Sequence, residues 1–193
     1  MSTDDQTRWD AQHLTSHGSE QPAPFLREIV ESSVWPALGG KALDIACGKG
    51  RNAIYLAQHG FAVTALEISA VALAEGRRRA EELELTIDWQ QRDLEASALD
   101  LGEYDLIVNF NYLQRSLFPA LRQAVKPGGH VIFETYLIDQ AELGQPKNPD
   151  YLLRHNELLD SFQGFRVLFY REGRSMDGAA PAFRAGIFAQ RVR

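Results

Sequence analysis

A short apolar stretch that runs into a glycine-rich turn constrains the fold of this chain more than any other feature. Residues 42–46 are apolar apart from Asp44, as in a buried strand, and residues 52–58 have the composition of a helix. Gly48 and Gly50 lie between the two segments. In α/β proteins a strand, a glycine turn and a helix bring backbone amides against a ligand, and a Cβ at the glycines would hold that ligand away. The sequence therefore predicts a ligand-binding α/β domain.

The spacing of this turn fits two classes of ligand. Residues 48–53 match the dinucleotide-binding pattern G-x-G-x-x-G/A, and Glu67 follows at the separation of a ribose-binding acid. Asp44 discriminates between the classes, because a carboxylate at the end of the strand would repel the pyrophosphate of NAD. The same carboxylate would help to bind a ligand with an ammonium and a sulfonium, although Arg51 could offset its charge. We favour the cationic ligand and keep the dinucleotide as the alternative.

The pattern Asp44-x-x-x-Gly48-x-Gly50 resembles the first motif of the class I S-adenosylmethionine-dependent methyltransferases. The resemblance runs over about residues 43–133, which would be the cofactor half of the domain. More narrowly, the sequence of residues 44–52, together with a tryptophan in the N-terminal arm, is similar to that of the small bacterial tellurite-resistance-type methyltransferases. The resemblance implies a Rossmann-like sheet of seven strands, mostly parallel, in which the last strand runs against the others.

The periodicity of the chain agrees with such a sheet. Strands are expected at residues 42–46, 61–67, 86–91, 104–110 and 130–135, and helices from residue 24 and over 52–58, 69–85, 113–125 and 152–162. Residues 139–149 read as a long loop. The connection between two further strands, 165–170 and 183–190, is too short for a crossover helix, so this pair is expected to be an antiparallel hairpin. The sequence predicts one doubly wound α/β domain over residues 1–193.

Acidic or amide side chains end the early strands of this predicted sheet, at Asp44, Glu67, Asp93 and Asn109. The carboxyl ends of parallel strands form one ligand-binding edge. The family resemblance gives each residue a role toward S-adenosylmethionine. It implies that Asp44 and Asn109 lie near the methionine portion and that Glu67 accepts hydrogen bonds from the ribose hydroxyls. Asp93 would accept a hydrogen bond from the adenine amino group.

Four further positions carry the same resemblance. The main chain at Gly48 and Gly50 would approach the cofactor, Ile68 would pack beside the adenine, and the amide of Leu94 would donate to a ring nitrogen. The cofactor is therefore expected to be S-adenosylmethionine, held by these four residues and the four strand-end side chains.

The acceptor side of the site is less defined by the sequence. Methyl transfer is an in-line displacement whose leaving group departs neutral, so alignment and desolvation can supply most of the catalysis. The catalytic residue is left unassigned. Of the candidates Tyr112, Arg115, Glu134, Tyr136 and His155, Tyr112 is the best placed to border the methyl group, with ordinary aromatic packing as the alternative. Trp9, Arg115 and Tyr136 join Tyr112 as candidates for the substrate pocket. The chain has no His-Glu-x-x-His, paired cysteines or Asp-rich loop, so no metal is expected.

Charge and composition narrow the partners and the compartment. A net charge of −6 argues against sequence-independent binding of nucleic acid, and no apolar run approaches the length of a membrane span. The expected partner is a small-molecule substrate, with the chain as a monomer or homodimer. The one cysteine, Cys47, cannot form an internal disulfide, and the N-terminus lacks the pattern of a signal peptide. These features predict a cytoplasmic protein.

Residues 1–22 form a polar arm that is expected to be irregular. Trp9 needs a place to bury its ring, and the open crevice of the sheet is one such place. The arm is therefore a candidate lid over the site, with a disordered tail as the alternative.

The sequence as a whole predicts an S-adenosylmethionine-dependent methyltransferase that acts on a small-molecule acceptor by in-line methyl transfer. An NAD(P)-dependent oxidoreductase and a non-catalytic S-adenosylmethionine-binding module are the two alternatives. The acceptor itself is not readable from the residues.

Overall fold

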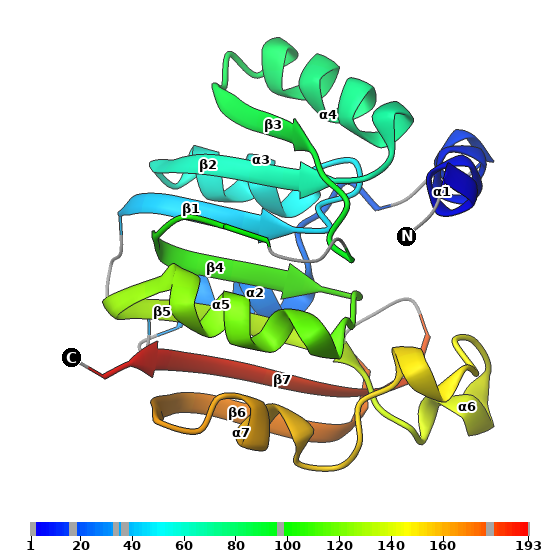
Figure 1. Cartoon of the computed structure of the whole chain (residues 1–193), viewed down its shortest axis with the longest axis vertical. Coiled ribbons are helices and arrows are strands. Elements are labelled where there is room, and N and C mark those ends of the chain that lie inside the picture. Colours follow the sequence, from blue (N-terminus) through cyan, green and yellow to red (C-terminus); the bar gives the residue numbers. More distant parts are fainter. Residues whose placement is uncertain are drawn as a thin grey trace.

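A computed structural model of the chain describes residues 3–15, 19–32, 35, 39–95, 99–176 and 180–192. Its centre is one seven-stranded sheet in the order β3-β2-β1-β4-β5-β7-β6 (Figure 1). The strands are β1 (Gly40–Ile45), β2 (Phe61–Glu67), β3 (Ile87–Gln91), β4 (Tyr104–Phe110), β5 (Val125–Tyr136), β6 (Phe165–Ser175) and β7 (Ala182–Arg191). Strands β1 to β5 pair in parallel, whereas β7 runs antiparallel to both β5 and β6. The prediction of a mostly parallel sheet with a C-terminal antiparallel hairpin is confirmed.

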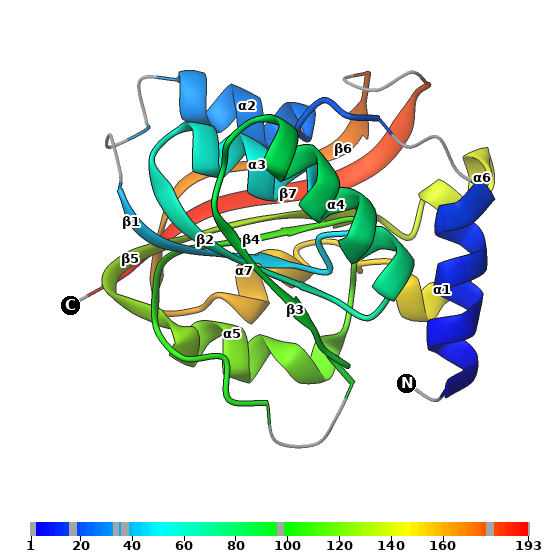
Figure 2. The same cartoon turned by 90° about the horizontal axis from the view of Figure 1, so that it is seen from above.

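Helices cover both faces of the sheet. Helices α2 (Pro24–Glu31), α3 (Arg51–Gln58) and α4 (Ala70–Glu82) pack on one face, and α5 (Phe118–Ala124) and α7 (Glu157–Ser161) pack on the other (Figure 2). Successive residues of a strand point to opposite faces, so β1 contributes Ala42 to the first core and Leu43 and Ile45 to the second. The sheet is thereby buried on both sides, as a parallel sheet requires.

Several element boundaries follow directly from local sequence chemistry. Pro24 occupies the first turn of α2, where its missing N–H costs no hydrogen bond. The hydroxyl of Ser69 accepts from the amide of Ala72 at 3.1 Å and caps the N-terminus of α4. Gly60 follows α3 with a φ of 85°, a conformation that favours glycine. These three predicted boundaries are confirmed.

Two predicted helices are shorter than their periodicity suggested. Over residues 113–125 the chain forms a 3-10 turn (Arg115–Leu117) and then α5, and β5 already begins at Val125. Over residues 152–162 only α7 is helical. Its predicted first turn is extended instead, because Leu153 donates to the carbonyl of Tyr136 at 2.8 Å and so continues the edge of β5. The predicted loop at 139–149 contains one short helix, α6 (Gln140–Leu143).

The expectation that the N-terminal arm is irregular is wrong for Thr3–Thr15, which forms helix α1. Figure 1 shows α1 beyond the carboxyl ends of β1 and β2, beside the N-terminal end of α4. This polar helix has little apolar periodicity, so the sequence pattern does not reveal it. Short polar helices are only marginally stable in isolation, so α1 depends on its contacts with the rest of the protein to stay folded. In the part of the chain that the structure describes, no helix is long and apolar enough to cross a membrane.

Candidate functional site

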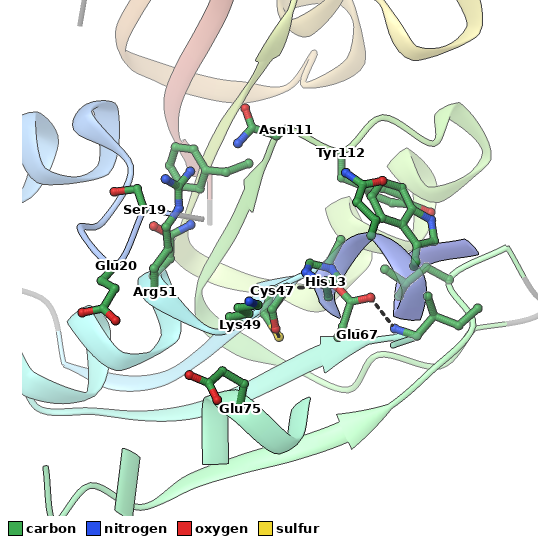
Figure 3. A pocket seen from close by; sticks show the side chains of 18 of the residues that line it. His13, Ser19, Glu20, Cys47, Lys49, Arg51, Glu67, Glu75, Asn111 and Tyr112 are labelled. Carbon is green, nitrogen blue, oxygen red and sulfur yellow. Dashed lines mark hydrogen bonds between the residues drawn. The ribbon is translucent and has the colours of Figure 1, made fainter. Parts of the chain in front are cut away.

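A cavity of about 1120 Å³ lies at the carboxyl ends of the central strands (Figure 3). The turn after β1 and the ends of β2, β4 and β5 form its base, and α1 supplies one wall. This is the edge at which open α/β sheets bind ligands. The residues that line it are Trp9, Gln12, His13, Leu14, Ser19, Glu20, Ala46, Cys47, Gly48, Lys49, Arg51, Asn52, Glu67, Ile68, Glu75, Arg79, Arg92, Leu94, Phe110, Asn111, Tyr112, Tyr136, Gln145 and Pro146.

The two glycines of the turn have different environments. Gly48 lines the cavity with a φ of 55°, and a Cβ built on it would meet only the Cε1 atom of His13, at 3.5 Å. Gly50 has a φ of 75° and does not line the cavity. A Cβ on Gly50 would lie 2.2 Å from Cη2 of Trp89. Gly48 therefore leaves space beside the ligand site, whereas the space beside Gly50 is filled by Trp89. The expected approach of the Gly50 main chain to a cofactor stays a prediction.

Trp89 of β3 explains a second glycine that the sequence analysis missed. A Cβ on Gly76, inside helix α4, would lie 2.7 Å from the same indole ring and 3.3 Å from the carbonyl oxygen of Lys49. A glycine in a helix interior is unfavourable, so its presence there was the available signal for a close approach. Gly50 and Gly76 together form the hollow that holds Trp89 and brings α4 close to the turn.

Glu67 ends β2 beside the turn, and only 6% of its surface is exposed. One carboxylate oxygen, Oε2, accepts from the amide of Gly48 at 2.9 Å. The other, Oε1, accepts from the amides of Ile68 at 2.9 Å and Ser69 at 3.0 Å. A carboxylate has about four lone-pair directions, so one on Oε2 is left for a further donor. Glu67 thus holds the turn and also faces the cavity.

The residues expected around an adenine are only partly brought together. Ile68 and Leu94 line the cavity, as expected for its walls. Asp93 does not line it, and its Oδ1 atom accepts from the amide of Glu95 at 2.8 Å. The turn that follows β3 therefore uses Asp93 as a local cap.

Asp44 and Asn109 are each 1% exposed and lie just beneath the lining. Because Asp44 pairs in register with Val108, Asn109 lies one residue further along and faces the opposite side of the sheet. Burial raises the pKa of Asp44 to about 7, while the amide of Ala53 and the charge of Arg51 act in the opposite direction. Asp44 Oδ2 and Asn109 Oδ1 have no hydrogen-bond partner among the described residues. Buried acceptors without a partner are rare and favour a bound donor.

Of the candidates for the acceptor pocket, some line the cavity and one, Arg115, does not. Tyr112 and Tyr136 line the cavity, and the buried Tyr112 hydroxyl has no hydrogen-bond partner in the described parts of the chain. Burial raises the pKa of the Tyr112 phenol well above its usual range, so it stays neutral.

Arg115 does not line the cavity. Its guanidinium pairs with Glu157 at 2.6 Å and donates to the carbonyl oxygens of Asp150 at 3.0 Å and Leu152 at 2.7 Å. Its contacts indicate a structural role in holding the segment before α7.

Two arginines that the sequence analysis did not assign to the acceptor pocket lie near Tyr136: Arg51 lines the cavity, whereas Arg184 lies outside the lining and contacts two residues of it. Arg51, the first residue of α3, lines the cavity. Arg184 of β7 donates to Oδ1 of Asn111 at 2.8 Å, and its guanidinium lies 4.1 Å from the ring centroid of Tyr136. The available signal was an arginine between the apolar residues of a predicted strand. The contact itself spans 73 positions of sequence and is not encoded locally.

Helix α1 forms one wall of the cavity. Trp9 and His13 lie on its inner side, with ring centroids 6.1 Å apart, and both line the cavity. Asp10 anchors the helix, because its Oδ1 atom accepts from the hydroxyl of Ser69 at 2.5 Å and from the amide of Val71 at 3.3 Å. A carboxylate at the N-terminus of α4 also interacts favourably with the helix dipole. Burial lowers the pKa of His13 from its usual value.

The described residues contain no cluster of three or more His, Cys, Asp or Glu side chains that could hold a metal ion. The site therefore combines the glycine turn at Gly48 with the carboxylate of Glu67, which has room for one more donor. The buried acceptors of Asp44 and Asn109 lie beneath it, Arg51 and Tyr136 line it, and helix α1 forms one wall.

Part of the chain is similar in sequence to known methyltransferases. Residues 42–129 match the family described as "Methyltransferase domain". The ubiquinone biosynthesis O-methyltransferase of Pectobacterium atrosepticum is 38% identical over 103 residues, which are 50% of this chain and 43% of that protein. The chain spans about half the length of the curated relatives it matches, for example 42% and 57% of two others.

Solved structures show the same fold at low identity. TehB from Haemophilus influenzae superposes with a TM-score of 0.68 and 22% identity over 78% of this chain and 57% of that chain. The magnesium protoporphyrin IX methyltransferase ChlM from Synechocystis PCC 6803, solved with bound SAH, gives a TM-score of 0.70 and 18% identity over 98% of both chains.

Proposed function

We propose that the protein is an S-adenosylmethionine-dependent methyltransferase that methylates a small-molecule acceptor, because residues 42–129 match the methyltransferase domain family and the sheet has the class I methyltransferase fold. The observation that carries the proposal is the pair of unpaired buried acceptors, Asp44 Oδ2 and Asn109 Oδ1, at the ends of β1 and β4. They suit a ligand whose ammonium and sulfonium groups bring positive charge to this edge. The pyrophosphate of a dinucleotide would bring negative charge instead.

Different residues around the turn would contact different parts of the cofactor. Glu67 would accept from a ribose hydroxyl through the free direction on Oε2, and Gly48 would leave room for the amino-acid portion. Ile68 and Leu94 would enclose the adenine as apolar walls. Gly50 and Asp93 lie outside the cavity lining, as Asp44 and Asn109 do, and their expected contacts with the cofactor stay predictions.

S-adenosylmethionine would supply an electrophilic methyl group, and the residues of this chain would align the acceptor and exclude water. In-line transfer leaves a neutral thioether, so little charge has to be stabilised at the donor. Tyr112 borders the cavity with a hydroxyl that stays neutral and can orient an acceptor atom. A soft or anionic acceptor needs no protein base, which fits a site without an obvious one.

Titration calorimetry with S-adenosylhomocysteine and with NADH tests the proposal. We expect S-adenosylhomocysteine to bind with a dissociation constant in the micromolar range, about −8 kcal/mol, and NADH not to bind detectably. Transfer of a labelled methyl group to a panel of thiol, selenium, tellurium, amine and phenol acceptors then tests catalysis. Binding of NADH alone would contradict the proposal. Binding of S-adenosylhomocysteine without transfer to any acceptor would indicate a non-catalytic binding module.

We further propose that α1 acts as a lid over this site, since Trp9 and His13 form one wall of the cavity and Asp10 ties the helix to α4. Undocking would open the cavity to water and to ligands. A 13-residue polar helix is marginal in isolation, so undocking should also unfold it.

Replacing Asp10 with alanine should weaken this docking by about 1.5–3 kcal/mol, the contribution of hydrogen bonds to a charged group. Hydrogen exchange read by mass spectrometry should then show faster exchange over residues 3–15, with the sheet unchanged. Glu81→Ala, an exposed carboxylate on α4, is the matched control and should exchange like the parent protein. Unchanged exchange over residues 3–15 in the Asp10 variant would show that α1 is held by other contacts.

A further inference from the structure

Arg51 lines the cavity beside Asn111 and Tyr136, and Arg184 contacts both of these lining residues from outside the lining. Figure 3 shows Arg51 and Asn111 toward one side of the pocket, and Glu67 and Tyr112 toward the other. Arg51, Asn111 and Tyr136 all line the cavity. The inference that follows rests on the proposed methyltransferase function and concerns the acceptor that this end would hold.

Arg51 is a partly buried cation, and no other residue that the structure describes gives it a hydrogen bond or an ion pair within 4 Å. Burial lowers the pKa of its guanidinium, and the nearby charge of Arg184 acts in the same direction. The negative charge of Asp44 partly compensates. A guanidinium nevertheless stays protonated in proteins, so Arg51 presents a full positive charge to the cavity.

Arg184 is held by three neighbours, Asn111, Glu134 and Tyr136. Its Nη1 atom donates to Asn111 at 2.8 Å and lies 3.6 Å from a carboxylate oxygen of Glu134, and its guanidinium stacks on Tyr136. Its Nε and Nη2 groups have no hydrogen-bond partner among the residues described. The side chain is 20% exposed. Its contacts with Asn111 and Tyr136 orient these donors before any ligand arrives. Asn111, with a φ of 58°, adopts the left-handed conformation that places its amide there.

The neighbouring carboxylates do not neutralise this end. Glu134 is almost fully buried and lies closer to Arg171, at 2.9 Å, than to Arg184, at 3.6 Å. Its one negative charge is therefore shared between two guanidinium groups. Burial disfavours the charged form of Asp44 and raises its pKa to about 7. A positive end to the cavity thus persists in a chain whose net charge is −6.

We propose that Arg51 and Arg184 together bind an anionic group of the methyl acceptor, a carboxylate or a comparable oxyanion. Guanidinium groups match such anions with paired, charge-assisted hydrogen bonds. The ring of Tyr136 and the amide of Asn111 fix the orientation of Arg184, and with it the position of the bound anion. The acceptor class is then a small organic anion with its nucleophilic atom directed toward Tyr112.

Binding of benzoate and benzamide to the protein saturated with S-adenosylhomocysteine tests this assignment. The two probes have nearly the same shape and differ in charge. We expect benzoate to bind at least about tenfold more tightly, equivalent to about 1.4 kcal/mol, measured by ligand-observed NMR or calorimetry. The preference should shrink when salt is raised from about 0.05 to 0.3 M, because screening weakens charge attraction. Equal binding of the two probes would overturn the proposal.

Substitutions assign the preference to the two arginines. Arg51→Gln and Arg184→Gln should each reduce benzoate affinity by at least about tenfold and leave benzamide and S-adenosylhomocysteine affinity unchanged. Arg184→Lys keeps the charge and should retain part of the preference, which protects the test if Arg184→Gln proves unstable in a thermal melt. Arg166→Gln, an exposed arginine on β6, is the matched control and should behave like the parent protein.

Two other outcomes would contradict the assignment. If Arg51→Gln weakens S-adenosylhomocysteine and leaves the benzoate preference intact, Arg51 binds the carboxylate of the cofactor and not the acceptor. If the parent protein does not bind S-adenosylhomocysteine, the proposed function fails. The benzoate and benzamide comparison in the ligand-free protein then still decides whether the arginines form an anion site.

Discussion

Replacing Gly50 with alanine should lower the free energy of unfolding by about 2–5 kcal/mol. Its Cβ would lie 2.2 Å from the ring of Trp89, and overpacking of this kind costs about 1–3 kcal/mol. The φ of 75° adds about 1–2 kcal/mol of strain for a residue with a side chain. For a chain of this length each kcal/mol lowers the melting temperature by about 2–4 °C, so calorimetry or a urea titration should detect the change readily.

Gly48→Ala is the matched control for this substitution. Its Cβ would meet only His13, at 3.5 Å, so the expected cost in stability is limited to about 1–2 kcal/mol of backbone strain. Gly50→Ala should also be partly rescued in a Trp89→Leu background, because the smaller side chain removes the clash. Equal destabilisation by the two alanine variants, or additive effects of Gly50→Ala and Trp89→Leu, would show that Trp89 is not the cause.

Replacing Glu67 with alanine should weaken the binding of S-adenosylhomocysteine by about 1.5–3 kcal/mol, roughly 10- to 150-fold, because it removes a charged acceptor for the ribose. The structure adds a second effect. Glu67 accepts from the amides of Gly48, Ile68 and Ser69, so its removal leaves three donors without their partner. We therefore also expect a loss of stability of about 1–3 kcal/mol, which calorimetry and thermal melting would measure on the same sample.

Glu67→Gln separates the two effects. Glutamine keeps one acceptor oxygen of similar reach, so it should retain part of the amide network while losing the charge. Its stability should lie between those of the parent and the alanine variant. If the alanine variant binds S-adenosylhomocysteine with unchanged affinity, Glu67 serves only the turn and the ribose assignment is wrong.

The sheet could be predicted from the sequence because its signals are local. Strand β4 coincides with the predicted 104–110, and the antiparallel hairpin follows from a connection too short for a helix. Each of these segments is a compact apolar run between turn residues, and burial on both faces enforces the strand. The positions of Gly48, Glu67 and Ile68 at the cavity follow from the same rule, since they lie at the ends of predicted strands.

The remaining features depend on contacts between distant segments. Helix α1 has no apolar stripe, and its docking uses Asp10 and Ser69, which are 59 positions apart. Gly50 could be recognised as a glycine of the turn, but its partner Trp89 could not be identified before the strands were placed. Arg184 contacts the cavity lining through a hydrogen bond to Asn111, 73 positions away. Sequence periodicity reports burial along one segment and carries no information on such pairings.

Ser69 connects the ligand-binding residue Glu67 to the docking of helix α1. Its amide donates to Glu67, and its hydroxyl donates to Asp10 while accepting from Ala72. One residue thus touches both the ribose acid and the anchor of α1. Thermodynamic linkage then requires that any shift in α1 docking caused by a ligand on Glu67 be matched by an equal shift in ligand affinity caused by docking. In kinetic terms, the residence time of the spent cofactor would be set by how often α1 leaves Ser69, and product release would share its rate with the unfolding of a 13-residue helix.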